Sequence, residues 1–260
     1  MKINELSVAE AALLLDVKWA GAELLRLTFK ELLLRKVLKV SPDPKGEGET
    51  QWENATIGRG EHFSGYNPPA SSAAFTEQFV ADDVQVELKL YFRTVGQWYG
   101  GGRQFRDFLL RNMKQADYFS QGFFERLFGQ YSLSPKGREV QHRLSALINA
   151  YDALALAQEA DTTKLRDLLE QLGPLVLLAK HHDPVWLQGI FKESREPLVT
   201  GDQFVDTWFM WLAWDSIIFT DHWDGMEDGF DFGDGGACST DSGCSGGGGC
   251  SGCGGCGGCS

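Results

Sequence analysis

The amino-acid sequence predicts a mainly α-helical protein with small β-hairpins, built as tandem winged-helix-like units followed by a helical C-terminal region and a disordered tail. Three observations lead to this prediction. Apolar periodicity near the N-terminus gives the order helix, helix, strand, loop, strand. A weaker version of the same order follows it. The chain then ends in a segment dominated by glycine, serine and cysteine.

The composition supports a folded body with a separate tail. The chain has 260 residues, of which 43% are hydrophobic, and this is enough to bury a large core. We predict four regions: a winged-helix-like unit over 1–60, a second, weaker winged-helix-like unit over 61–145, a helical region over 146–223, and a disordered tail over 224–260 that is first acidic and then rich in Gly and Cys.

The first unit begins with a capping box. Ser7 and Glu10 can satisfy each other's exposed amides just before an apolar run, so a helix begins there. Apolar spacing and turn residues predict the elements that follow: a break over 16–21, a helix over 24–35, a strand over 37–40, a turn-rich loop over 41–50 and a partner strand over 51–57. This order is typical of a winged-helix unit.

The second unit repeats the pattern less clearly. We predict a helix over 73–95, a glycine turn at 100–102, a helix through 105–110, an aromatic segment over 123–128 and a strand over 131–133. Ser134 and Pro135 then open another helix, because serine caps well and that proline lacks only an amide that would be unpaired. This helix continues over 138–158, and a further one runs over 163–172 until Gly173 and Pro174 stop it.

Three stretches resemble an uncharacterised bacterial family with winged-helix-like repeats and a C-terminal Gly/Cys-rich tail. They are LSVAEAALLLDV (6–17), LLLRKVLKV (32–40) and YSLSPKGREV (131–140). The resemblance covers about residues 5–145 and the tail. It implies the architecture predicted above and no established activity. Many members of that family have transmembrane segments, which this chain is expected to lack.

The charge pattern favours a protein partner over nucleic acid. The net charge is −12, and residues 221–260 hold seven acids and no Lys or Arg. Residues 1–40 have a balance of only +2, which would neutralise few phosphates. We therefore predict that the helical body binds a protein partner, and we keep a winged-helix DNA-binding regulator as the third hypothesis.

The sequence also predicts a cytoplasmic protein without a membrane span. Acidic residues interrupt the apolar N-terminus, unlike a secretory signal. The apolar stretch 204–219 is short and contains Asp206 and Asp215, so it is expected to form a core helix. Four tryptophans fall in or just after this stretch, and a partner-binding groove or oligomer seam is the alternative for it.

The tail holds the most unusual chemistry. All six cysteines lie in the last 23 residues, among ten glycines and five serines: Cys238, Cys244, Cys250, Cys253, Cys256 and Cys259. The last four have the spacing C-x2-C-x2-C-x2-C, and four thiolates suffice for a tetrahedral centre. We predict that the tail binds zinc or another soft metal ion, with a neutral low-complexity end as the plain alternative.

A second hypothesis concerns modification of the tail. Five of the six cysteines follow glycine, and serine follows four of them. Each thiol could attack the unhindered carbonyl before it and form a five-membered ring. This composition is similar to the modified region of thiazole- and oxazole-containing microcins, so a ribosomally made precursor and a tail-modifying enzyme as its partner are the alternative.

Other candidate sites have simpler interpretations. The triplet 181–183 (HHD) precedes a proline and is expected to be a loop rather than a metal or catalytic site. The turn 100–102 lacks the GK[ST] ending of a phosphate-binding loop. The acids of 221–234 do not match the EF-hand spacing and are expected to form a solvated hinge. The sequence as a whole predicts a non-enzymatic intracellular protein-interaction module.

Overall fold

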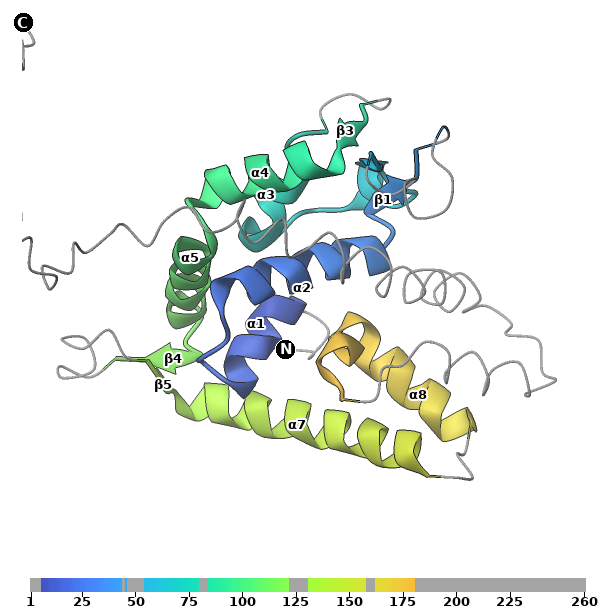
Figure 1. Cartoon of the computed structure of the whole chain (residues 1–260). Helices are drawn as coiled ribbons and strands as arrows, with labels where there is room; N and C mark the ends of the chain where they lie inside the picture. Colours follow the sequence, from blue (N-terminus) through green and yellow to red (C-terminus); the bar gives the residue numbers. More distant parts are fainter. Residues whose placement is uncertain are drawn as a thin grey trace, which may run out of the picture.

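The computed structural model describes residues 6–43, 45, 54–79, 84–121, 131–157 and 162–180 (Figure 1). Within this part the protein is mainly helical with small antiparallel sheets, as predicted. The helices are α1 (Val8–Leu15), α2 (Gly21–Leu34), α3 (Ala73–Thr76), α4 (Leu88–Tyr99), α5 (Gly102–Gln115), α7 (Pro135–Leu156) and α8 (Thr162–Leu172). Three 3-10 helices are η3 (Phe63–Gly65), η4 (Ala70–Ser72) and η5 (Gly173–Leu178).

The two helix starts predicted from capping residues are confirmed. At α1 the Ser7 amide donates to Glu10 Oε2 (2.9 Å) and the Glu10 amide donates to Ser7 Oγ (3.2 Å), which completes the capping box. At α7 the Gly137 amide donates to Ser134 Oγ (3.0 Å), and Pro135 occupies the first turn. α8 ends at Leu172, directly before the Gly173 and Pro174 that were expected to stop it.

Five strands among the described residues form two sheets. β1 (Leu38–Ser41), β2 (Thr56–Arg59) and β3 (Val86–Glu87) form the first sheet in that order, and β4 (Phe119–Ser120) and β5 (Ser132–Leu133) form the second. All pairs are antiparallel, with Val40 opposite Ile57 and Phe119 opposite Leu133. The partner strand expected over 51–57 therefore begins at Thr56 in the described residues.

The single helix predicted over 73–95 is wrong. In this range the described residues form three separate elements. These are α3, which directly follows η4, then β3, and then the first part of α4. Val86 pairs with Ile57 of β2, so a sheet rather than a helix satisfies the backbone there. The alternation of Val84, Val86 and Leu88 fits a strand better than a helical face.

The same order of elements occurs twice, with corresponding helix residues 81 positions apart. We call α1-α2-β1-β2 the first repeat and α4-α5-β4-β5 the second repeat. Both long helices end in the same way. Lys36 (φ 53°) and Asp117 (φ 63°) take the left-handed conformation two residues after the helix. The next residue donates back into the helix: Val37 to the Leu32 carbonyl and Tyr118 to the Met113 carbonyl, both at 2.9 Å.

The two repeats meet at their long helices. α2 and α5 cross at corresponding first residues, Gly21 and Gly102. A Cβ on Gly21 would clash with the backbone carbonyl of Gly102, and a Cβ on Gly102 would lie 2.6 Å from the Ala22 amide nitrogen. Only glycine permits this approach of two backbones.

The core lies around α1 and α2. Six of the eight α1 residues are buried, and α1 packs against α2, α7 and η5. Figure 1 shows α7 crossing the side of the molecule opposite α4, with α8 folded back against it. No helix among the described residues is long and apolar enough to cross a membrane. The region boundaries at 60, 145 and 223 stay predictions.

Candidate binding groove

The residues predicted to carry the tail chemistry lie outside the described residues. They are Cys238, Cys244, Cys250, Cys253, Cys256 and Cys259. The triplet 181–183, the aromatic stretch 204–219 and the acidic segment 221–234 lie outside them as well. Within the described residues no cluster of three or more His, Cys, Asp or Glu side chains is placed to hold a metal ion. The metal site therefore stays a prediction.

The glycine turn at 100–102 connects α4 to α5, as the sequence predicted. Gly100 (φ 73°) ends α4 in the left-handed conformation and Gly101 (φ 100°) precedes α5. Gly102 is buried against α2. These glycines serve chain reversal and helix packing.

Helix α2 is enclosed by the fold. Every residue of Gly21–Leu34 is buried or half-buried. The corresponding helix α5 keeps an outer face, on which Arg103, Gln104, Asp107 and Arg111 are exposed. Of the two corresponding helices, α5 therefore presents the more exposed face.

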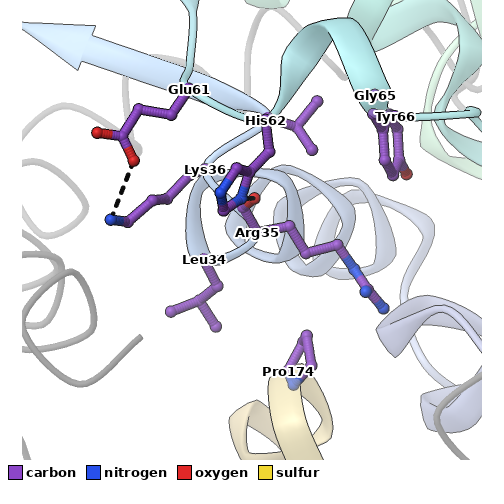
Figure 2. Close-up of a pocket in the computed structure, with 9 residues that line it drawn as sticks. Leu34, Arg35, Lys36, Glu61, His62, Gly65, Tyr66 and Pro174 are labelled. Atoms are coloured by element: carbon purple, nitrogen blue, oxygen red, sulfur yellow. Dashed lines mark hydrogen bonds and ion pairs between the residues drawn. The ribbon is translucent and has the colours of Figure 1, made fainter. Parts of the chain in front are cut away.

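A hollow with a volume of about 700 Å³ lies at the C-terminal end of α2. It is lined by four residues at and after the end of α2, four from the segment after β2, and one from η5: Leu34, Arg35, Lys36, Val37, Glu61, His62, Gly65, Tyr66 and Pro174. Figure 2 shows these side chains around the end of α2, with Pro174 approaching from η5. We call this hollow the α2 groove.

The segment after β2 folds over the end of α2 and fixes one wall of the groove. The Gly60 amide donates to the Val37 carbonyl (2.8 Å), and the His62 amide donates to the Lys36 carbonyl (3.0 Å). The His62 Nδ1 lies 3.1 Å from the Arg35 carbonyl oxygen (Figure 2). The free carbonyls of the helix end thus hold His62 in place.

The second repeat caps the same three carbonyls with different residues. The Ser134 amide donates to the Tyr118 carbonyl (3.0 Å), and Ser134 Oγ donates to the Asp117 carbonyl (2.6 Å). Lys136 Nζ donates to the Ala116 carbonyl (2.6 Å), where His62 stands in the first repeat. A side-chain nitrogen therefore caps the corresponding helix-end carbonyl in both repeats, and in the first repeat its residue, His62, also lines the groove.

A buried carboxylate stands behind the groove. Glu31 is 4% exposed and accepts from the Val8 amide (2.7 Å) and from Arg35 Nε (2.8 Å). Burial raises the pKa of Glu31 above its ordinary value, although the Arg35 charge and the Val8 amide oppose this effect. The arrangement ties the start of α1 to the end of α2 and orients the Arg35 side chain at the groove.

The remaining walls are apolar or weakly polar. The apolar residues of the lining are Leu34, Val37 and Pro174, and all three are buried, so they border the groove from beneath its polar side chains. The Tyr66 hydroxyl lies 3.1 Å from Ser72 Oγ, and burial raises the pKa of Tyr66, so the phenol stays neutral. A smaller hollow of about 310 Å³ also borders Tyr66, and Phe63, Pro68, Thr76, Glu77 and Phe79 line the rest of it.

The groove combines hydrogen-bond donors, two of them the cations Arg35 and Lys36, with apolar residues in its lining. Arg35, Lys36 and His62 stand at one site, and Lys36 Nζ also pairs with Glu61 Oε2 at 3.2 Å. This arrangement can bind a carboxylate next to an apolar side chain. Sequence reasoning missed the groove because its residues come from three separate segments, and the short stretch 60–66 carries no recognisable motif.

No family model, no curated protein and no solved structure matches this chain. The resemblance to a family with winged-helix-like repeats therefore stays a prediction from the three stretches quoted for it.

Proposed function

We propose that the protein is a non-enzymatic cytoplasmic interaction protein. Its α2 groove binds a peptide segment of a protein partner, and its tail thiols bind zinc or another soft metal ion. The observation that carries the first part is the juxtaposition of Arg35, Lys36 and His62 with the apolar Leu34, Val37 and Pro174 in one hollow. The peptide that fits this surface pairs an acidic side chain with a large apolar one.

The size of the groove supports a peptide segment as the ligand. A hollow of about 700 Å³ falls within the range of small-ligand sites and accommodates a few side chains rather than a whole protein face. Arg35, Lys36 and His62 stand at the end of α2, where each side chain is already held by a neighbour, so little side-chain freedom is lost on binding.

The groove is tested with a display library of random twelve-residue peptides screened against the full chain. We expect the selected peptides to place Asp or Glu close to Leu, Ile or Phe. Gly65 lines the groove, and a Cβ at this position meets nothing within 4 Å. Gly65→Leu should therefore fill the hollow without disturbing the fold and weaken binding about tenfold or more. Leu156→Ala, on the exposed end of α7, is the control.

The proposal for the groove fails if Gly65→Leu binds the selected peptides as well as the native chain does. It fails equally if the selected peptides carry no acidic residue.

The support for the metal part is the tail sequence itself, with four thiols at three-residue spacing. Native mass spectrometry of the reduced full chain with added Zn²⁺ or Cu⁺ measures the stoichiometry directly. We expect bound metal that is lost when Cys250, Cys253, Cys256 and Cys259 are all replaced by serine, because the thiolates are the ligands. An equal metal load on the serine variant contradicts the proposal.

The Gly-Cys-Ser pattern of the tail supports a second candidate, a precursor whose tail is heterocyclised. Each ring closure removes one water molecule, whereas a bound metal leaves the mass of the acid-denatured chain unchanged. The intact mass of protein from its native host therefore separates the two candidates. An unmodified mass together with no bound metal eliminates both.

A winged-helix DNA-binding regulator is the third candidate, and the observation that favours it is the exposed face of α5 with Arg103, Gln104 and Arg111. The enclosure of α2 counts against a reading helix in the first repeat. Substituting Arg111 by alanine should weaken binding to a random-sequence DNA duplex and reduce its salt dependence if this candidate is right.

A further inference from the structure

The outer face of α4 is the most exposed apolar surface on a helix of the second repeat. Leu90 is 52% exposed and Trp98 is 60% exposed, and they lie about two turns apart on one side of the helix. Arg93 and Gln97 between them are exposed as well. Figure 1 shows α4 at the edge of the molecule, on the side away from α7.

In the first repeat the corresponding face, on α1, is buried. Leu90 and Arg93 of α4 correspond to Ala9 and Ala12 of α1, which are both 0% exposed. They are buried because α1 packs against α7 and η5, two segments that follow both repeats in the chain. The outer helix of the first repeat is therefore covered by later residues of the same chain.

The charge of the α4 surface indicates what would cover it. Residues 84–121 hold six Lys or Arg residues and only three acids. Lys89 and Arg93 are exposed on α4 itself. Residues 181–260 hold 13 acids and two basic residues, and no Lys or Arg follows Arg195. Nearly all the net negative charge of the chain thus lies beyond the described body, and the second repeat is complementary to it.

The stretch 204–219 is apolar enough to cover the exposed Leu90 and Trp98 of α4. It contains Trp208, Trp211 and Trp214 together with Asp206 and Asp215. Tryptophans at this density need cover from water. The 23 residues between Lys180 and this stretch can span about 75 Å, whereas a body of this size has a radius of gyration of about 16 Å. The connection is therefore long enough for the stretch 204–219 to reach α4 from the end of η5.

We propose that residues 204–223 bind the outer face of α4, with their tryptophans against Leu90 and Trp98 and their acids beside Lys89 and Arg93. This contact completes the second repeat as α7 and η5 complete the first. It also tethers the cysteine tail to the body at a point 15 positions before Cys238. The contact is independent of the α2 groove.

Hydrogen exchange of the full chain, read by mass spectrometry on peptides from 204–223, tests the contact. Leu90→Asp should make these amides exchange about tenfold faster, because it removes an apolar contact and adds a like charge. The control is Leu156→Asp, which alters another exposed leucine on α7 and should leave the exchange unchanged. Thermal unfolding of both variants confirms that the body is intact, as the exposure of both side chains leads us to expect.

A photo-crosslinking phenylalanine analogue in place of Leu90 identifies the occupant. A crosslink to 204–223 within one chain is the expected product. A crosslink to a second copy, to any other segment, or no crosslink at all overturns the proposal. Exchange of 204–223 that is unprotected in the native chain, or equal in Leu90→Asp and the native chain, overturns it too.

Discussion

The two repeats share their turns and differ in their surroundings. Both end their long helix with a residue at positive φ and the same backward hydrogen bond, and both have the three carbonyls at that end capped. Yet α1 is almost fully buried, while α4 exposes Leu90 and Trp98. The difference teaches that local structure repeats with the local sequence, whereas burial depends on which segments return to cover each helix.

The two repeats also differ in the burial of one polar side chain on their long helices. Glu31 in the first repeat is buried and receives hydrogen bonds from Val8 and Arg35. Its counterpart, Asn112, is half-buried on α5. In the first repeat the ionisable Glu31 thus connects α1 to α2 by hydrogen bonds. Its partner Arg35 lines the α2 groove.

The glycine crossing joins the two repeats, and breaking it should have the largest effect. Gly21→Ala places a Cβ against the Gly102 carbonyl, so α2 and α5 must move apart. We expect the free energy of unfolding to fall by about 3 kcal/mol, at the upper end for an overpacked core. Denaturant unfolding measures the change. Gly65→Ala, which meets nothing within 4 Å, should change it by less than about 0.5 kcal/mol.

The buried carboxylate distinguishes the repeats energetically. Glu31→Ala leaves the Val8 amide without its acceptor and Arg35 without its partner, so we expect a loss of about 2 kcal/mol in unfolding free energy. Asn112→Ala at the corresponding position should cost less than half as much. Similar losses of unfolding free energy in both variants would show that the hydrogen bonds of Glu31 do not stabilise the first repeat preferentially.

The pH dependence follows from the raised pKa of Glu31. Between the ordinary carboxyl pKa and this raised pKa, the folded protein binds more protons than the unfolded chain. The contribution of Glu31 to stability is therefore fully present below the ordinary value and is lost as the pH rises through the raised value. Unfolding free energies measured against pH should show the native chain losing stability relative to Glu31→Gln over this window. A constant difference contradicts the assignment.

The helix ends provide the smallest and finest comparison. Lys36 and Asp117 both have positive φ, but aspartate tolerates this conformation better than lysine. Lys36→Gly should raise the unfolding free energy by about 0.5–1 kcal/mol, since its exposed pair with Glu61 contributes little. Asp117→Gly should raise it by less. The opposite order in chemical denaturation would mean that side-chain contacts, not backbone strain, dominate at these positions.

Helix starts and turns were the features best predicted from sequence. The Ser7 capping box, the Ser134-Pro135 start of α7 and the glycine turn before α5 all occur where local chemistry placed them. The helix predicted over 73–95 was wrong because β3 gains its hydrogen bonds from β2, about thirty positions earlier in the chain. A strand of two residues has too little local pattern to be detected without its partner.

The sequence by itself determined where α1 and α7 begin, where α8 ends, and where the thiols and the negative charge are concentrated, since capping, turn chemistry and composition act over a few neighbouring residues. Only the tertiary structure decided that Gly21 meets Gly102, that Glu31 holds the start of α1, and that Arg35, His62 and Pro174 share one groove. These contacts join residues from about 20 to more than 100 positions apart, and such pairings depend on how whole helices pack rather than on any local preference.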